Sequence, residues 1–519
     1  MNALKGAGIN SILDLSVEAD LDEAELKGQS PDHIRARFNQ SADYVADQIS
    51  ACIQTASSMT KSFAAIKITA MGSPLLLQQI STTLDALESS FQKMDQDRDG
   101  KVTKEEFKQL VKMLPNPVHN QENLDAVVDH LFKEADKDQD GRIDWVDFAC
   151  TVSMNRDETR ALFASDSSKN AAIPGLESAD LEDYKRLLTR MENLCEQAEK
   201  THTRLMIDAE QTYFQPAIDS VALHLQERFN RSATATGPLD SDSGDKDGPL
   251  VFNTYQMYLK DALGRLQQDY TRAQRNGYVL AAKLVRGAYM VSERRRAQEL
   301  GLEDPICNGI EATHASYNAG VDFMLGEMMN SRAKTGLKQI EDESSSSSSS
   351  ASLISLSLKS SPVVLFVASH NKDSVIRTCE RMQELELTPQ SGLVMFGQLM
   401  GMCDQISYTL GQHGYGIYKY VPYGPIHHVI PYLIRYVQWL PDFFRSLHNN
   451  VWFLTTSLPF WSSLTETNSR AQENASVLGG VTVERRLLWE ELKSRFLIQK
   501  GRAQIHSATI VPTGPATTM

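Results

Sequence analysis

The sequence has few cysteines for its length, and none of the six stands in a C-x-x-C pair. This scatter argues against a disulfide framework and is typical of a reducing compartment with buried thiols. The chain also lacks a net positive charge. The net charge of −14 argues against general nucleic-acid binding, which needs a basic face. No apolar run reaches the ~20 residues of a membrane-spanning helix.

The start of the chain lacks targeting features. MNALKGAGINSILDLSVEAD contains neither a secretory apolar region nor an Arg-rich amphipathic presequence. Two alternatives follow, a cytosolic protein or a chain whose start is missing. The 519 residues, 41% of them hydrophobic, suffice for one large domain and a smaller one.

Short apolar runs alternate with helix-length segments along most of the chain. Several runs are continuously apolar, as expected for parallel strands that are buried on both faces. Eight βα units predict an α/β fold, a (β/α)8 barrel. An open doubly wound sheet is the alternative, and the absence of G-x-G-x-x-G after any run weakens it. The expected strands are residues 10–15, 64–70, 203–208, 250–254, 279–285, 363–368, 393–396 and 417–421.

Four regions interrupt the alternation. Residues 85–155 form a separate unit, and residues 232–248 are a polar linker. Residues 341–361 contain seven consecutive serines and are typical of a disordered surface insertion. Residues 436–469 are aromatic and hold three of the five tryptophans. The remaining segments are assigned to the barrel: 1–84 as its first part, 156–435 as its main part, and 470–519 as C-terminal helices and tail.

Two loops in the region 85–155 match the pattern of a calcium-binding EF-hand loop. The first has oxygen ligands at positions 1, 3 and 5, a glycine at position 6, a carbonyl ligand at position 7 and a closing carboxylate at position 12. The second loop begins 41 residues later and closes with a shorter aspartate, which predicts weaker or magnesium-tolerant binding. The alternative is acidic surface loops that bind nothing. The expected ligands are Asp95, Asp97, Asp99, Lys101 and Glu106, then Asp136, Asp138, Asp140, Arg142 and Asp147.

Polar residues follow several of the expected strands at their C-terminal ends, the rim where (β/α)8 barrels bind ligands. Lys67 lies in an otherwise apolar run, and burying it requires a carboxylate or an anionic ligand. An ion pair between Lys67 and Asp208 is the structural explanation. His370 and Tyr420 fall on the same rim, although a lone histidine after a strand is more often a core residue.

Several segments together resemble eukaryotic proline dehydrogenase, also called proline oxidase. They are FAAIKITAMG, LMIDAEQTYFQPAID, NTYQMYLK, KLVRGAYM, VASHN, FGQLMGMCDQIS, KYVPYGP and PYLIR, with RAQEN at 470–474. The resemblance implies a distorted (β/α)8 barrel that holds FAD, with an EF-hand insertion. It also implies oxidation of L-proline to Δ1-pyrroline-5-carboxylate and electron transfer to ubiquinone, peripherally at the matrix face of the mitochondrial inner membrane.

The resemblance assigns roles residue by residue. Arg435 and Arg470 correspond to tandem arginines that hold the substrate carboxylate, with Glu473 one helical turn further on. Tyr289 and Tyr420 correspond to aromatics around the proline ring, and Tyr420 favours proline over 4-hydroxyproline. Lys67 and Asp208 correspond to a supporting ion pair. The flavin contacts correspond to Gln256, Lys283, Val285, Arg286, Gly287, Ser369 and His370.

Residues 436–469 separate the two arginines, so two hypotheses from different classes remain. The first is an active FAD-dependent proline dehydrogenase with a calcium-binding insertion. The second is a catalytically silent product in which only the EF-hand module works. The abrupt borders of residues 436–469 favour a translated intron or a gene-model error, and an excursion that lets both arginines meet is the alternative.

Overall fold

The fold was analysed in a computed structural model. The structure describes residues 2–15, 30–57, 62–116, 121–165, 172–231, 248–343 and 361–423. Contacts divide the chain into two compact units, residues 1–432 and 433–519. The second unit lies outside the described residues, as do the predicted insertion 436–469 and nearly all of the polar linker and the serine run.

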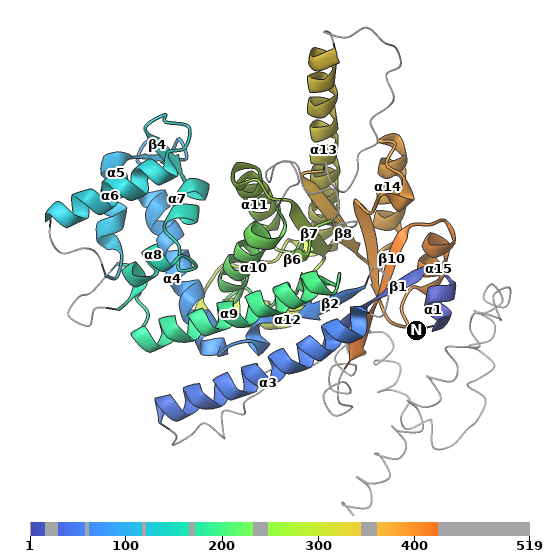
Figure 1. The fold of residues 1–519 in the computed structure, drawn as a ribbon, viewed down its shortest axis with the longest axis horizontal. Coiled ribbons are helices and arrows are strands. Elements are labelled where there is room, and N and C mark those ends of the chain that lie inside the picture. Colours follow the sequence, from blue (N-terminus) through green and yellow to red (C-terminus); the bar gives the residue numbers. More distant parts are fainter. Residues whose placement is uncertain are drawn as a thin grey trace, which may run out of the picture. The chain divides into compact units, whose positions relative to one another are not determined.

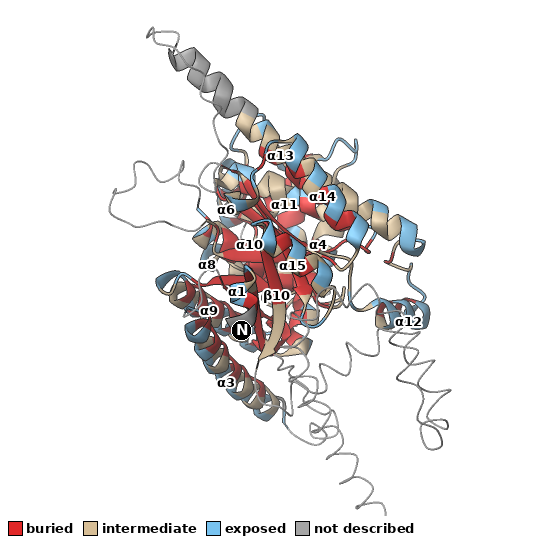
Figure 2. Ribbon diagram, turned by 90° about the vertical axis from the view of Figure 1, so that its right-hand side faces the viewer, coloured by how far each residue is buried: buried red, intermediate tan, exposed pale blue. Residues whose placement is uncertain are grey.

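Eight parallel strands close into a barrel in the order β1-β10-β9-β8-β7-β6-β5-β2. The predicted (β/α)8 barrel is therefore confirmed. Seven of the strands are buried along most of their length (Figure 2), which explains the continuous apolar runs in the sequence, whereas β10 is buried only at residues 417–419. The strands are β1 (Ile9–Leu15), β2 (Phe63–Ile66), β5 (Arg204–Ile207), β6 (Val251–Gln256), β7 (Leu280–Val285), β8 (Val363–Ala368), β9 (Val394–Leu399) and β10 (Gly416–Tyr423).

One expected strand is shorter than the sequence predicted. Residues 64–70 were expected to be extended throughout, but β2 ends at Ile66 and a 3-10 turn, η1 (Ile68–Ala70), follows. The Thr69 N–H and hydroxyl both donate to the carboxylate of Glu210, at 3.1 and 2.5 Å. Glu210 thus supplies the hydrogen-bond acceptor that a neighbouring strand would otherwise provide to the Thr69 N–H. Residues 68–70 can therefore be buried and apolar without being part of the strand.

The barrel interior is packed around Phe63 of β2, which is fully buried. Its ring makes edge-to-face contacts with Phe252, Phe366 and Tyr418, at centroid distances of 5.3, 5.7 and 5.1 Å. These rings come from β6, β8 and β10, so one side chain joins strands on different sides of the barrel. Aromatic pairs of this geometry add about 0.5–1.5 kcal/mol each beyond the area that they bury.

Replacing Phe63 with alanine is therefore expected to reduce the free energy of unfolding by about 3–5 kcal/mol, because it leaves a cavity among three rings. Phe63→Leu should lose less, since most of the volume remains. Guanidinium unfolding followed by far-UV circular dichroism measures both variants. An alanine variant within about 1 kcal/mol of the parent would contradict this packing.

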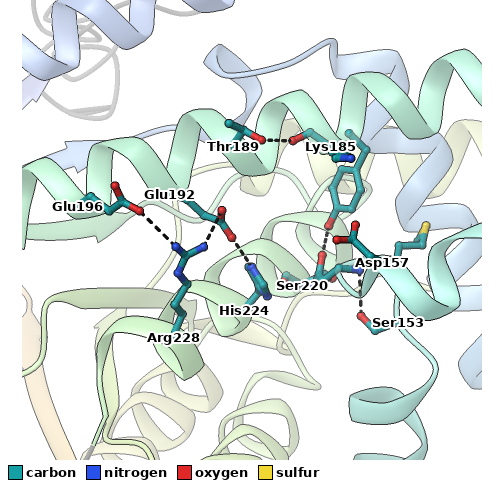
Figure 3. Close-up of polar contacts among 12 residues, drawn as sticks. Ser153, Asp157, Lys185, Thr189, Glu192, Glu196, Ser220, His224 and Arg228 are labelled. Carbon is teal, nitrogen blue, oxygen red and sulfur yellow. Dashed lines mark hydrogen bonds and ion pairs between the residues drawn. The ribbon is translucent and has the colours of Figure 1, made fainter. Parts of the chain in front are cut away.

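Helices cover the outside of the barrel (Figure 1). Two of them are joined by a polar cluster in which Glu192 on α9 is bonded to α10 (Figure 3). Glu192 lies 2.9 Å from His224 Nε2 and 2.7 Å from an Arg228 nitrogen, and Arg228 also reaches Glu196 at 3.2 Å. The covering helices are α3 (Pro31–Ser57), α9 (Ser178–Lys200), α10 (Gln215–Phe229), α11 (Ala262–Asn276), α13 (Gly309–Glu343), α14 (Lys372–Glu384) and α15 (Asp404–Gln412). Helix α12 (Met290–Leu300) follows β7 and is mostly exposed.

Residues 95–151, hereafter the two-loop unit, contain the two acidic loops. Both loops are flanked by helices, and Val102 of β3 pairs with Ile143 of β4 in a short antiparallel ribbon. The first flanking helix begins at Pro74 and ends at Met94, so the proposed boundary at residue 85 falls inside a helix. The elements are α4 (Pro74–Met94), β3 (Lys101–Thr103), α5 (Lys104–Met113), α6 (Gln121–Ala135), β4 (Arg142–Asp144) and α7 (Trp145–Thr151).

The cysteines agree in part with the expectation of buried thiols. All six are free, and Cys52 and Cys195 are buried. Burial raises the pKa of Cys52 to about 12. Within the described ranges, no helix has both the length and the hydropathy to cross a membrane.

Candidate active site

The C-terminal ends of the barrel strands carry a group of polar and charged side chains. Lys67 follows β2, Asp208 follows β5, and Lys283 lies in β7. Ser369 follows β8, and Tyr420 lies in β10. Because parallel strands end at the same mouth of a barrel, residues that are distant in the sequence meet there.

Asp208 is the centre of this group. Its carboxylate accepts from the ammonium of Lys283 at 2.5 Å and from the hydroxyl of Tyr420. The Lys283 ammonium also lies 5.4 Å from the centroid of the Tyr420 ring. Burial acts to raise the pKa of Asp208, but the charges of Lys283 and Lys67 and the two hydrogen bonds outweigh it and lower that pKa. Asp208 is thus an ionised carboxylate that fixes a lysine and a tyrosine.

Lys67 has a different partner from the one expected. We predicted an ion pair between Lys67 and Asp208, whereas Lys67 Nζ donates to Asp14 Oδ1 at 3.3 Å and Asp208 pairs with Lys283. Asp14 is 1% exposed and lies in β1, next to β2 in the barrel. Sequence reasoning missed Asp14, although an acid inside the apolar run INSILDL is the same kind of signal that singled out Lys67.

Glu210 lies two residues beyond Asp208 and is buried. Its carboxylate holds Thr69 of η1, and its carbonyl accepts from Gln256 Nε2 at 2.7 Å. Burial raises the pKa of Glu210 to about 7, despite the opposing hydrogen bonds from Thr69. Glu210 therefore links the segment after β5 to η1, which follows β2, and to the end of β6.

Arg286, directly after β7, forms a second polar group. Its guanidinium donates to the hydroxyls of Ser369 and Ser374 at 2.7 and 2.9 Å and to His314 Nδ1 at 3.1 Å. It lies 4.3 Å from the centroid of the Tyr317 ring. These partners are all neutral, and no ion pair to Arg286 occurs among the described carboxylates. Burial lowers the pKa of this guanidinium. A half-buried cation among neutral donors and acceptors is a suitable partner for an anionic group.

The other predicted flavin contacts surround this arginine. Gln256 uses both ends of its amide, since its Oε1 accepts from the Ala288 N–H at 3.2 Å. Val285 ends β7 opposite Gln256. Gly287 has φ +142°, and a Cβ there would lie 2.4 Å from the ring of Tyr258, so only glycine fits. These residues form a tight connection after β7 that leaves the Arg286 side chain on the rim.

His370 is a neutral acceptor in this structure. Its Nε2 accepts from the N–H of Leu399 at 3.0 Å. Burial, and then the charge of Lys419, lowers the pKa of His370 to about 4. His370 accordingly holds the ends of β8 and β9 together and carries no charge at neutral pH.

This depressed pKa predicts a pH dependence of stability. The unfolded chain takes up a proton on His370 near pH 6.5, whereas the folded chain resists it down to about 4. Stability should therefore be lost as pH falls through this window, by an amount of the order of 2–3 kcal/mol. In His370→Gln the free energy of unfolding should fall less between pH 7 and 4. Parallel stability profiles for the two proteins would contradict the assignment.

Of the remaining predicted substrate residues, the structure describes Tyr289 alone. Tyr289 lies beyond β7, and its N–H donates to the hydroxyl of Tyr258 at 3.3 Å. Arg435, Arg470 and Glu473 lie outside the described residues, so the predicted carboxylate clamp stays a prediction.

Each acidic loop gathers its first three aspartates. Their carboxylate oxygens, one from each residue, lie within 4.8 Å of one another in Asp95, Asp97 and Asp99, and likewise in Asp136, Asp138 and Asp140. Gly100 and Gly141 adopt φ +85° and +79° at the sharp turns. This arrangement can hold a cation through oxygen ligands.

The other predicted ligands have protein partners. Glu106 accepts from the Thr103 N–H at 2.8 Å and caps α5. The side chains of the two position-7 residues cross between loops, Lys101 to Asp140 and Arg142 to Asp99.

The fold is a closed barrel of eight parallel strands, and Lys283, Asp208 and Tyr420 form a charged group at its C-terminal mouth. These features define a (β/α)8-barrel protein with a candidate catalytic site. The family model described as proline dehydrogenase matches residues 1–438. This chain belongs to the proline dehydrogenase family.

Individual relatives show the extent of the similarity. Proline dehydrogenase 1, mitochondrial, of Homo sapiens is 34% identical over 439 residues, 83% of this chain and 60% of the relative. The Caenorhabditis elegans protein of the same name is 29% identical, over 98% of this chain and 78% of its own length. Hydroxyproline dehydrogenase of Bos taurus is 34% identical over 68% of this chain and 60% of the relative. The chain thus spans about 60% of the length of the human and bovine proline dehydrogenases it matches.

Among solved structures, proline utilization A (PutA) from Bdellovibrio bacteriovorus, inactivated by N-propargylglycine, aligns with a TM-score of 0.48. The two chains are 14% identical, over 84% of this chain and 30% of the other.

Proposed function

We propose that this chain oxidises L-proline to Δ1-pyrroline-5-carboxylate with FAD and passes the electrons to a quinone, the first step of proline catabolism. The observation that carries the proposal is the Lys283–Asp208–Tyr420 cluster at the mouth of the barrel. Family membership supports the same proposal. The sequence resemblance assigns a functional role to each of these three residues.

The residues at the rim fit an anionic dinucleotide cofactor. Arg286 is a half-buried cation whose described hydrogen-bond partners are all neutral, so the negative pyrophosphate of FAD would supply the missing counter-charge. Ser369 already bonds to this guanidinium and would share the same anion. When bound, FAD supplies the two-electron acceptor that no side chain can provide.

The chain's own groups then bind and position the substrate. Lys283, held by Asp208, would present a fixed ammonium where negative charge develops on the cofactor ring. Tyr420, fixed by the same carboxylate, would cover one side of the proline ring and favour proline over 4-hydroxyproline. Arg435 and Arg470 would bind the substrate carboxylate. No protein base is needed, because the amine can lose its proton before or during binding.

Location and cation binding belong to the same proposal. The human, bovine, Caenorhabditis and Drosophila relatives are all named mitochondrial, which supports a mitochondrial location. Peripheral association with the inner membrane rests on the sequence resemblance alone. The gathered aspartates of the first loop support calcium binding there, closed by Glu106.

A coupled assay tests the function. The purified chain, loaded with FAD, should reduce a soluble quinone analogue when L-proline is added, and it should release a cyclic imine that ortho-aminobenzaldehyde traps as a coloured adduct. trans-4-Hydroxyproline serves as the matched substrate control and should react more slowly. Equal rates with both substrates would contradict the role of Tyr420, and no proline-dependent product would contradict the proposed activity.

A further inference from the structure

The second acidic loop faces a basic residue of the barrel. Helix α11 ends at Asn276, and Arg275 in its last turn points at the loop residues of positions 9 and 12, Asp144 and Asp147. The guanidinium donates one hydrogen bond to each carboxylate oxygen of Asp144, at 2.7 and 2.6 Å, and another to Asp147 Oδ2 at 2.8 Å. One arginine thus holds both carboxylates at the closing end of the loop.

Neighbouring contacts continue this interface. Lys137, at position 2 of the loop, donates to Asn276 Oδ1 at 2.8 Å, and Asn276 Nδ2 lies 3.3 Å from Cys150 Sγ on α7. Beyond α7, Asn155 donates to Ser220 of α10 at 3.0 Å and accepts from the Tyr184 hydroxyl of α9 at 2.6 Å. The second loop and the segment after it therefore dock the two-loop unit on the barrel helices.

The first loop differs in this respect. Across the described ranges, the ion pairs of its Asp97 and Asp99 are made with Arg142 of the second loop, and none reaches a barrel helix. Its closing Glu106 caps its own helix. The side chain of Asp97 is 60% exposed, against 19% for Asp147. The two loops thus have similar sequences but different surroundings.

One carboxylate oxygen of the second loop has no hydrogen-bond partner among the described residues. This atom is Asp136 Oδ1, at position 1, and it is buried. Such an atom is normally satisfied by a partner or a bound ion. A cation there would need the carboxylate of Asp147 as a ligand, which Arg275 already contacts, and it would place a divalent charge within a few ångströms of the guanidinium. The cation and Arg275 cannot both occupy the closing end.

We propose that Arg275 closes the second loop in place of a cation, so that this loop is the docking surface between the two-loop unit and the barrel. The first loop is then the one that binds calcium in the intact chain. Binding to the second loop and docking through Arg275 are mutually exclusive, and by linkage each weakens the other. The assignment of calcium to the first loop rests on the proposed function, whereas the competition at the second loop does not.

Calcium titration calorimetry of the full chain, after chelator treatment, tests the proposal with calcium alone as the probe. The parent should bind one calcium ion, and Glu106→Gln should abolish that event. Arg275→Gln should gain a second site, with at least tenfold higher affinity than the second loop of the parent. Asp136→Asn in the Arg275→Gln background should remove the gained site, which assigns it to the second loop.

Two further variants sharpen the comparison. Arg275→Lys keeps the charge but cannot donate the paired hydrogen bonds to Asp144, so the second loop should bind calcium with an intermediate affinity. This variant replaces Arg275→Gln in the comparison if Arg275→Gln fails to fold. Arg294→Gln breaks an ion pair with Asp304 that neither loop shares and should leave calcium binding unchanged.

Each outcome decides one claim. Equal numbers of sites and equal affinities in the parent, Arg275→Gln and Arg275→Lys would overturn the proposal, whether or not calcium binds at all. A parent that binds no calcium, beside an Arg275→Gln chain with one site that Asp136→Asn removes, would overturn only the assignment of calcium to the first loop.

Discussion

Asp208→Asn is expected to lower kcat/KM for L-proline by about 100-fold or more, because small displacements of positioning groups reduce rates by that order. Asparagine keeps the shape of aspartate but removes the charge that fixes Lys283 and Tyr420. The buried lysine then has no counter-charge from this residue. Breaking one side of such a pair also destabilises a protein by about 3–5 kcal/mol. Steady-state kinetics and chemical unfolding measure the two effects separately.

A double variant separates the chemical role from the structural one. Asp208→Asn with Lys283→Met removes both charges, so it should regain much of the lost stability without regaining activity. Asp129→Asn is the matched control, since Asp129 is exposed and pairs with the exposed Lys104 at 2.8 Å. It should change stability by no more than about 1 kcal/mol. Asp208→Asn retaining kcat/KM within twofold of the parent would contradict the proposed role.

Removing residues 436–469 should raise proline turnover by about 100-fold or more, if the intact sequence keeps the two arginines apart. The deletion makes Arg435 and Arg470 consecutive, and consecutive residues of a helix lie about 100° apart, so both can reach one carboxylate. Hydrogen bonds to charged groups contribute about 1.5–3 kcal/mol each, and 1.4 kcal/mol is a factor of ten. Steady-state turnover of the intact and shortened chains makes the comparison.

The control deletion removes residues 344–360, which contain the serine run, and should leave turnover unchanged. Equal activity of the intact and shortened chains would show that the two arginines already meet, and would contradict the idea of a split clamp. Sequencing the transcript tests the origin of the segment separately. Residues 436–469 encoded in the mature message would contradict a gene-model error.

The barrel could be predicted from the sequence because buried parallel strands are continuous apolar runs. β8 has the expected bounds, and the other strands differ by a few residues at their ends. The exception, residues 64–70, shows the limit of the pattern. An apolar run can be buried as a 3-10 turn as readily as a strand when a side chain such as Glu210 satisfies its backbone.

The partners of charged residues were harder to predict than their positions. Lys67 and Asp208 were both expected at the rim, but their pairing depends on which strands are neighbours in the closed barrel. Asp14 becomes the partner of Lys67 only because β1 lies beside β2. Arg275 gave no sequence signal, since an arginine in the last turn of a helix is ordinary, and only the fold brings it to a loop 128 residues away.

The most direct test of the central claim uses the bound cofactor as its own indicator. The intact chain and the chain without residues 436–469 are loaded with FAD and titrated with L-proline, without oxygen or any other acceptor. Proline should cause a saturable loss of the oxidised flavin's visible absorption, most clearly in the shortened chain, and in Asp208→Asn this loss should be about 100-fold slower at the same proline concentration. Bound flavin that stays oxidised in both chains at saturating proline would contradict the proposed activity.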